Sequence, residues 1–296
     1  MTNRWIAVLS LVTAFYANGL CAKQIHKERS IYRNVVIVEE EGLRCMRFET
    51  RRKKITNQAC IDLEKPERLV FEYAHGTLAA LAHNPKPERV LILGLGGGVL
   101  SKVIHELSPE SEIVSVDIDP VVVKLAKKYF DYQENNKIKT EIRDGRVYVK
   151  RSLLKKEKFD WIILDAFNGD YIPEHLMTRE FLQEVKGLLS DNGIVSANTF
   201  SNSKLYDYES VTYQNVFGKL FIFQAPTKGN RVIFGCNCDG FSLPRAVLEN
   251  PVEKIENFNV NMNSVLESLN DTIDWNTDSD ILTDQYSPAN LLKQAD

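Results

Sequence analysis

Val90-Leu-Ile-Leu-Gly-Leu-Gly-Gly-Gly98 is the stretch that decides the fold of this chain, together with Val116-Asp-Ile-Asp119 at the end of the next apolar run. The first stretch has the form of a strand that enters a glycine turn and then a helix. Glycines let the backbone turn tightly and approach a ligand, and a helix N-terminus offers unpaired N–H groups and a positive dipole end. An acidic residue about 20 positions further on is placed to accept hydrogen bonds from a ribose. The sequence therefore predicts a nucleoside-binding crevice.

Apolar runs alternate with helix-like segments through the centre of the chain, which predicts a mostly parallel sheet covered on both faces. The last two runs are separated only by residues 225–230, too few for a helical crossover, so they should form an antiparallel hairpin at the sheet edge. Strands are expected after 90–93 at 113–116, 138–142, 159–164, 193–197, 220–224 and 231–235. Helices are expected at 69–81, 100–107, 120–129, 145–154, 179–189 and 206–217.

The terminal hairpin and the glycine spacing distinguish between two kinds of Rossmann-like sheet. A seven-stranded sheet that ends in an antiparallel strand resembles the class I S-adenosylmethionine-dependent methyltransferase fold more than the nicotinamide dehydrogenase fold. The glycines agree, because Gly94, Gly96 and Gly98 follow the methyltransferase-type spacing, whereas the dinucleotide fingerprint would place its third glycine where the chain has Val99. The fold class is therefore α/β, and these three glycines are expected to contact the donor nucleoside.

The N-terminus has a different organisation. Arg4 precedes an uncharged apolar stretch, 5–16, and small residues follow it, which is the layout of a secretory signal peptide and is short for a membrane span. We expect residues 1–22 to be a signal peptide or anchor, with a buried first helix as the alternative. Three further regions are expected: a small β-strand unit, the Rossmann-like nucleoside-binding catalytic domain, and a C-terminal helical cap and tail, at 25–65, 66–240 and 241–296.

Five cysteines leave the redox compartment open. Cys45 and Cys60 lie on neighbouring strand-like segments and could form a disulfide, whereas Cys236 and Cys238 are too close in sequence for an easy mutual bridge. Reduced, partly buried thiols are the alternative. A cleaved leader would place the protein in the periplasm or outside the cell, and otherwise it would be membrane-anchored or cytoplasmic.

From Ser30 onward the chain resembles the spermidine synthases, or polyamine aminopropyltransferases, and is most similar to their spermidine-synthase-like branch. The motifs that carry the resemblance keep their order and spacing along the chain. They are Asn57-Gln58, Val90 to Gly98, Val116-Asp-Ile-Asp-Pro120, Arg143-Asp-Gly145, Phe159-Asp-Trp-Ile-Ile-Leu-Asp165-Ala and Leu282-Thr-Asp-Gln-Tyr-Ser-Pro288.

The resemblance implies binding of decarboxylated S-adenosylmethionine, or of S-adenosylmethionine itself, and attack by an amine on the carbon next to the sulfonium. It implies that Asp117 receives the ribose hydroxyls and that Asp144, with Gly145, lies at the adenine amino group. It places Gln58 near the sulfur and ribose end and makes Asp165 the residue that deprotonates or orients the attacking amine.

Four further residues are expected to face the substrate. Tyr73 and His75 lie on the helix before the central strand, where the family places Tyr or His residues toward the substrate; helix packing is the alternative for both. Asp170 is a candidate second charge near the amine, and Tyr171 begins a segment that could cover the crevice.

The residues support Asp165 without the resemblance. In an open α/β sheet the ligand crevice lies outside the C-terminal ends of the strands, and Asp117, Asp144 and Asp165 all follow apolar strands closely. An amine is protonated at neutral pH, so a carboxylate can both attract it and receive its proton. The alternative for each aspartate is a helix cap or turn residue.

Two departures from the family leave the transferred group and the acceptor open. The spermidine-forming enzymes carry an aspartate inside the glycine loop where this chain has Gly97, and a second aspartate after the fourth strand where it has Asn168. A methyltransferase, or an exported nucleoside- or polyamine-binding protein without catalysis, are the alternative functions, and a nicotinamide oxidoreductase is a more distant one.

The partners expected are a small-molecule amine or another acceptor, with a homodimer left open. Net charge of −3 and a basic cluster without interleaved aromatic residues do not indicate nucleic acid. No cysteine or histidine cluster with zinc spacing occurs in the sequence, so no metal is expected.

Overall fold

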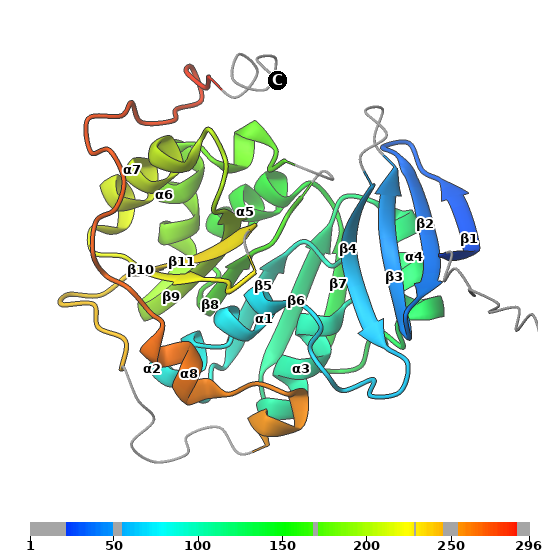
Figure 1. Cartoon of the computed structure of the whole chain (residues 1–296). Helices are drawn as coiled ribbons and strands as arrows, with labels where there is room; N and C mark the ends of the chain where they lie inside the picture. Colours follow the sequence, from blue (N-terminus) through cyan, green and yellow to red (C-terminus); the bar gives the residue numbers. More distant parts are fainter. Residues whose placement is uncertain (1–21, 50–54, 168–170, 228, 245–253, 289–296) are drawn as a thin grey trace, which may run out of the picture.

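A computed structural model of the chain describes residues 22–49, 55–167, 171–227, 229–244 and 254–288. Two β-sheets form its framework, a small one built from the N-terminal part and a large one built from the rest (Figure 1). Residues 1–21 of the expected leader lie outside the described ranges, so the leader stays a prediction. No helix in the described part is long and apolar enough to cross a membrane.

The large sheet has seven strands in the order β10-β11-β9-β8-β5-β6-β7. The five strands from β9 to β7 in this order pair in parallel, whereas β11 runs antiparallel to both β9 and β10. The predicted seven-stranded, mostly parallel sheet with an antiparallel terminal hairpin is confirmed. Its strands are β5 Arg89–Leu93, β6 Glu112–Asp117, β7 Ile138–Ile142, β8 Phe159–Leu164, β9 Leu189–Phe200, β10 Phe221–Gln224 and β11 Asn230–Cys236.

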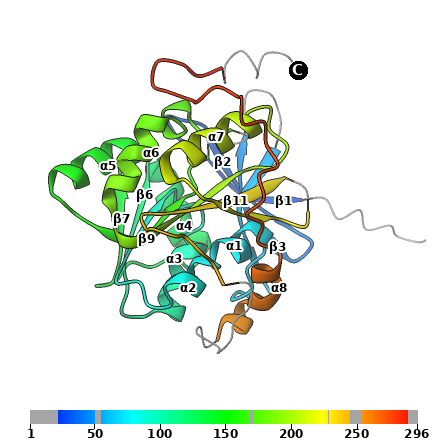
Figure 2. The same cartoon turned by 90° about the vertical axis from the view of Figure 1, so that its left-hand side faces the viewer.

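Helices cover both faces of this sheet, as Figure 2 shows edge-on. Because successive strand side chains point to opposite faces, one set packs with α1, α2, α3 and α8 and the other set with α5, α6 and α7. The helices are α1 Glu72–Thr77, α2 Ala80–His83, α3 Val99–Leu107, α4 Pro120–Tyr129, α5 Gly145–Leu154, α6 Arg179–Leu188, α7 Tyr206–Phe217 and α8 Met262–Glu267, with short 3-10 turns at Glu174–Leu176 and Ile255–Phe258.

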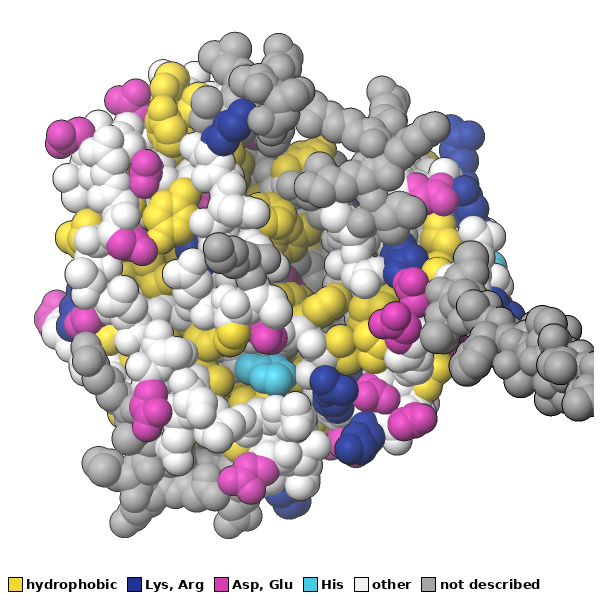
Figure 3. All heavy atoms as spheres, viewed as in Figure 1, with side chains coloured by type: hydrophobic (Ala, Val, Ile, Leu, Met, Phe, Trp, Pro, Cys, Tyr) yellow, Lys and Arg dark blue, Asp and Glu magenta, His cyan; other side chains and the backbone are white. Residues whose placement is uncertain are grey.

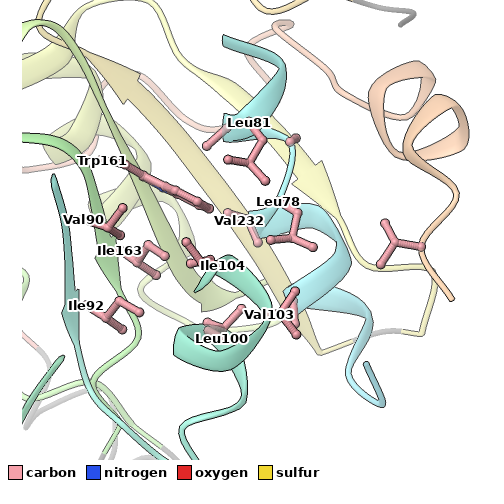
Figure 4. Packing of buried hydrophobic residues seen from close by; sticks show 14 of the residues in the cluster. Leu78, Leu81, Val90, Ile92, Leu100, Val103, Ile104, Trp161, Ile163 and Val232 are labelled. Atoms are coloured by element: carbon pink, nitrogen blue, oxygen red, sulfur yellow. The ribbon is translucent and has the colours of Figure 1, made fainter. Parts of the chain in front are cut away.

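Figure 4 shows the first of these two cores from close by. Trp161 and Ile163 of β8 lie beside Val90 and Ile92 of β5, and all four side chains are buried against α1 and α3. Burying an aliphatic or aromatic side chain of this size contributes about 1.5–3 kcal/mol. The central strands are therefore held firmly, and so are the residues at their C-terminal ends.

The small sheet is antiparallel, with strands in the order β1-β2-β3-β4. Its strands are β1 Lys23–Arg29, β2 Asn34–Glu40, β3 Leu43–Glu49 and β4 Ile55–Asp62. The turn between β2 and β3 has positive φ at Glu41 and Gly42, as a two-residue hairpin requires. The inner face of the sheet packs on α4, which joins the two sheets into one body.

The first strand of the small sheet, β1, is not visible in the sequence pattern. β1 is an edge strand whose side chains are mostly charged and largely exposed, so it shows no alternation of apolar and polar residues. The strand is held by hydrogen bonds to β2 and by an ion pair of Glu28 with Lys124 of α4 at 2.9 Å.

Both cysteine pairs in the described part of the chain form disulfides. Cys45 and Cys60 stand opposite each other on β3 and β4 and are bonded, as their spacing allowed. Cys236 and Cys238 are also bonded, so the expectation that they lie too close to bridge was wrong. β11 ends at Cys236, and the two Cα atoms lie 5.3 Å apart, within the usual range for a disulfide.

The helix predicted at 69–81 is two short helices, α1 and α2. The chain leaves α1 where Gly76 packs directly on β10, since a Cβ atom at this glycine would lie 2.1 Å from the ring of Phe223. The hydroxyl of Thr77 also donates to the carbonyl of Tyr73, a contact that competes with regular helix continuation. The helix is therefore interrupted by packing on the terminal hairpin, a long-range contact that the helical periodicity of residues 69–81 cannot show.

The described part of the C-terminal segment is mostly not helical, unlike the helical cap expected for 241–296. Residues 245–253 and 289–296 lie outside the described ranges, and within the described part of this segment only the 3-10 turn at Ile255–Phe258 and α8 are helical. The segment then runs past α7 (Figure 1), where Leu282 is fully buried and Asp284 pairs with Arg146 of α5 at 2.6 Å. It ties α5, α6 and α7 together.

Candidate active site

A cavity of about 1740 Å³ lies where the C-terminal ends of the parallel strands meet the small sheet. Residues from both sheets, from the glycine loop and from residues 171–177 line it. On the face drawn in Figure 3, hydrophobic side chains gather between the two sheets, while Lys and Arg side chains are scattered. The position agrees with the crevice predicted for an open α/β sheet.

The glycine loop between β5 and α3 brings the backbone close to neighbouring elements. A Cβ at Gly94 would lie 2.2 Å from the carbonyl oxygen of Asp165, so only glycine lets the ends of β5 and β8 meet this closely. Gly94 and Gly96 line the cavity. Gly98 is not among the residues that line it; it caps α3 with φ 72° and packs against the ring of Tyr132, and its contact with the donor stays a prediction.

Gly97 is closed to a larger side chain. A Cβ at this position would lie 2.9 Å from the ring of Phe130 and 3.0 Å from the side chain of Ala59. The loop aspartate of the spermidine-forming enzymes would therefore require α4 and the small sheet to shift. The packing between the two sheets therefore leaves no room for an aspartate at position 97.

Asp117, at the end of β6, is held in place by the backbone around it. Its Oδ2 accepts a hydrogen bond from Leu95 N at 3.0 Å, and its Oδ1 accepts one from Asp119 N at 2.9 Å. Burial raises the pKa of Asp117 above its usual value. The carboxylate lines the cavity beside the glycine loop, where it can still accept from a ligand, since each carboxylate oxygen has two lone pairs.

Asp144 lines the cavity one strand further along, but both of its oxygens already have protein partners. Oδ1 accepts from Val147 N at 2.9 Å and caps α5, and Oδ2 lies 3.0 Å from Nε2 of His175. Gly145, the first residue of α5, also lines the cavity. Asp144 is therefore a helix cap, as the alternative expected. Its carboxylate, which the resemblance assigns to the adenine amino group, is also in contact with His175.

Asp165 follows β8 directly and has two side-chain partners. Tyr73 donates its hydroxyl to Oδ2 at 3.1 Å, and Asn198 of β9 donates its side-chain amide to Oδ1 at 2.8 Å. Burial raises the pKa of Asp165 to about 6, and the two hydrogen bonds oppose this shift. The group can therefore take up and release a proton near neutral pH, as a general base requires.

Comparison with known proteins identifies the family of this chain. The model of the spermine/spermidine synthase domain matches residues 74–230. The polyamine aminopropyltransferase of Vibrio vulnificus is 46% identical over 277 residues, covering 91% of each chain. The chain belongs to the spermidine synthase family. It is an enzyme of the polyamine aminopropyltransferase class, which excludes the non-catalytic and oxidoreductase alternatives.

Solved structures of the family share the fold. A probable spermidine synthase from Corynebacterium glutamicum superimposes with a TM-score of 0.62 at 21% identity, covering 73% of this chain and 81% of that one. The spermidine synthase of Thermotoga maritima gives 0.59 at 22% identity, covering 80% and 76%. At these identities the likeness concerns the α/β framework with its small N-terminal sheet.

The remaining residues carried over from the spermidine synthase family divide into two groups. Gln58 and Tyr171 line the cavity, and the side-chain amide of Gln58 donates to Thr56 Oγ1 at 2.9 Å. His75 does not line it; its Nε2 lies 2.9 Å from the carbonyl oxygen of Leu69 and holds the start of α1. The packing alternative is therefore the one present for His75. Asp170 lies outside the described residues.

The structure adds two asparagines to the aminopropyltransferase site that the sequence did not single out. Asn230 of β11 donates to Oδ1 of Asn198 at 2.9 Å, and Asn198 in turn donates to Asp165. Both asparagines line the cavity. The register of β9 against β11 brings them together, and that register is not visible in either strand alone.

A buried ion pair borders the same cavity. Arg231 of β11 and Glu209 of α7 are both almost fully buried, and Nη2 lies 3.4 Å from Oε2. Arg231 also donates to Thr199, Ser210 and the carbonyl of Tyr206. Burial raises the pKa of Glu209 to about 7, against the effect of Arg231. Glu209 lines the cavity, whereas the remaining contacts of Arg231 fix α7 onto the sheet.

The charge of the cavity wall is mostly negative. Seven described carboxylate residues line it against three Lys and Arg residues: Glu49, Asp117, Asp119, Asp144, Asp165, Glu174 and Glu209 against Arg29, Arg33 and Lys204. Such a wall attracts cationic ligands. Among the described residues no group of three or more His, Cys, Asp or Glu side chains is arranged to hold a metal ion.

Proposed function

We propose that this aminopropyltransferase moves the aminopropyl group of decarboxylated S-adenosylmethionine to a small-molecule amine. The observation that carries the proposal is Asp165, a carboxylate with a pKa of about 6 held by Tyr73 and Asn198 in a predominantly acidic cavity. Sulfonium donor and ammonium acceptor are both cationic, so a wall of carboxylates favours bringing them together.

The chemistry requires one proton transfer and one substitution. Asp165, ionised above pH 6, receives a proton from the ammonium of the acceptor and leaves a neutral amine. The nitrogen lone pair then attacks the carbon next to the sulfonium; the C–N bond forms as the C–S bond breaks, and its electrons neutralise sulfur. Methylthioadenosine leaves without charge, and the new secondary amine carries the positive charge.

Tyr73 and Asn198 act by holding Asp165 in this scheme. Each donates one hydrogen bond to a different carboxylate oxygen, which fixes the plane of the carboxyl group. A fixed acceptor geometry contributes to rate because the reacting amine need not search for its orientation.

The test is product formation by the purified protein. Decarboxylated S-adenosylmethionine is incubated with a panel of monoamines, diamines and triamines, and methylthioadenosine and the aminopropylated amine are measured by mass spectrometry. The proposal predicts equal amounts of both products with at least one amine. A parallel series with S-adenosylmethionine tests methyl transfer. Release of no methylthioadenosine with any amine would contradict the proposal.

We further propose that the protein works in an oxidising compartment, the periplasm or the outside of the cell. Support comes from the disulfides Cys45–Cys60 and Cys236–Cys238 and from the signal-like composition of residues 1–22. Cell fractionation with a tag at the C-terminus tests it. Recovery of all the protein from the cytoplasm, with its cysteines reduced, would be the opposite result.

A further inference from the structure

Two buried polar atoms without partners line the cavity. Among the described residues, four buried side-chain nitrogen or oxygen atoms have no hydrogen-bond partner, and two of these four belong to cavity-lining residues, Nε of Arg33 and Oδ2 of Asp119. An unpaired buried polar atom destabilises the fold, and more so when the group is charged, so such atoms call for a partner. One of the two atoms is a donor and the other an acceptor.

Arg33 is held firmly in the turn that joins β1 to β2. Its backbone N donates to Oγ of Ser30, and its carbonyl oxygen accepts from the backbone N of Ser30. The guanidinium lies 4.3 Å above the ring of Phe48, and Nη1 donates to the carbonyl oxygen of Phe167 at 3.4 Å. The side chain thus reaches from the small sheet to the loop that follows β8. Burial lowers the pKa of Arg33, and the charges of Asp119 and Asp117 oppose this shift.

Asp119 is 1% exposed, two residues beyond Asp117. Its Oδ1 accepts from Val121 N at 2.9 Å and caps α4, which explains one oxygen of the carboxylate. The other oxygen, Oδ2, is buried and has no hydrogen-bond partner. The backbone N of Asp119 donates to Oδ1 of Asp117, so the two carboxylates are fixed relative to each other.

From this placement we infer that Arg33 and Asp119 bind a ribose hydroxyl of the nucleoside, next to the hydroxyl that Asp117 receives. A hydroxyl donates one hydrogen bond and accepts others, so a single hydroxyl matches an acceptor at Oδ2 and a donor at Nε. The inference rests on the proposed function for the identity of the ligand as a nucleoside. It makes the β1–β2 turn of the small sheet part of the donor site and makes the site selective for an intact ribose.

The experiment compares variants of the protein with variants of the ligand. Isothermal titration measures Kd for 5′-methylthioadenosine and for its 2′-deoxy and 3′-deoxy analogues with the full chain and with Arg33→Met and Asp119→Asn. Arg33→Met keeps the packing on Phe48 and removes the donor. Asp119→Asn keeps an oxygen to cap α4 and replaces the second one by a donor. Arg89→Met is the matched control, since Arg89 also lies over an aromatic ring, that of Phe159 at 4.6 Å, but does not line the cavity.

Each variant should bind 5′-methylthioadenosine about tenfold more weakly, the usual effect of one lost hydrogen bond to a charged group. The unaltered protein should show a similar loss with one of the two deoxy analogues. With that analogue the variants should bind as the unaltered protein does, because the contact is already missing. Arg89→Met should behave as the unaltered protein with all three ligands.

Two results would overturn the inference. Either the variants bind 5′-methylthioadenosine unchanged, as expected if only water joins the two atoms, or they weaken all three ligands by one common factor. Should Arg33→Met not fold, Arg33→Leu, which also packs on Phe48 and has no donor, gives the same comparison. If the unaltered protein binds no sulfur nucleoside at all, the proposed function fails with the inference. Binding by the unaltered protein without any effect of the variants rejects the inference alone.

Discussion

The hydroxyl of Tyr73 donates a hydrogen bond to Oδ2 of Asp165 across 92 positions of sequence, at 3.1 Å. Burial raises the pKa of both side chains, and Tyr73 therefore stays protonated as a donor while Asp165 titrates near pH 6. The pair separates two roles, with the tyrosine as a fixed donor and the aspartate as the group that exchanges a proton.

Replacing Asp165 should separate binding from turnover. Asp165→Asn removes the proton acceptor with little change in size, so kcat should fall at least about 100-fold, the usual scale for a general base. Binding of methylthioadenosine should stay within about twofold, because the donor contacts lie at Asp117 and the glycine loop. Steady-state kinetics and titration measure the two effects. Asp191→Asn, an exposed carboxylate outside the cavity, is the control; equal losses of binding and turnover would contradict the assignment.

The rate should depend on pH through Asp165. Its pKa is about 6, raised by burial, and only the ionised form accepts a proton. We expect kcat/KM to fall as pH drops below 6, by about tenfold for each further pH unit. The profile is measured between pH 5 and 9 with a saturating donor. An acid limb that persists unchanged in the residual activity of Asp165→Asn would assign the titration to another group.

The ionisation of Asp165 that activity requires should lower the stability of the fold. The pKa of Asp165 is higher in the folded protein, about 6, than its ordinary value of 3.8, so ionisation destabilises the fold. The penalty is complete above pH 6 and disappears as pH falls from 6 toward 4. At pH 8 Asp165→Asn should therefore raise the free energy of unfolding, by up to about 3 kcal/mol at 1.4 kcal/mol per pKa unit. Urea denaturation at pH 8 and pH 4 tests this, and the gain should be absent at pH 4.

The buried Arg231–Glu209 pair should be needed for the fold of α7. Arg231→Met removes four hydrogen-bonding contacts and leaves Glu209 buried without a counter-charge, so unfolding should become easier by about 3–5 kcal/mol. Thermal denaturation measures the loss. The double variant with Glu209→Gln should recover part of it, because no uncompensated charge then remains. A double variant no more stable than Arg231→Met would show that the charge is not the cause.

The two disulfides should differ in their effect on stability. Cys45–Cys60 closes a loop with a sequence separation of 15, for which chain entropy predicts about 3 kcal/mol, whereas Cys236–Cys238 closes a separation of 2. Cys45→Ala with Cys60→Ala should lower Tm clearly, and the corresponding change at 236 and 238 should lower it less. A thiol assay on the unfolded, unreduced protein checks that both bonds are present.

Much of the fold was predictable because its signals are local. Most of the parallel strands are short apolar runs between turns, and the short link before β11 required an antiparallel hairpin. Two elements were missed for non-local reasons. β1 has no apolar pattern because it lies at an exposed edge, and α1 ends early because Gly76 packs on Phe223, a residue of the distant hairpin.

The site residues at the C-terminal ends of parallel strands were predictable from the sequence, and those from other elements were not. Asp117, Asp144 and Asp165 all line the cavity, since parallel strands end at one edge of the sheet. Asn198 and Asn230 were missed because strand register joins them to Asp165. Arg33 was missed because it comes from a turn of the small sheet, whose position over the cavity depends on packing with α4.

The partners of Asp165 also set the order in which the site can be completed during synthesis. Along the chain Tyr73 and Asp165 come first, followed by Asn198, but Asn230 belongs to β11, the last strand of the sheet. Chains fold as they emerge from the N-terminal side, so the catalytic carboxylate gains its full surroundings only after the hairpin has been made and has docked beside β9. A growing chain can therefore build most of its parallel sheet while its active site is still incomplete.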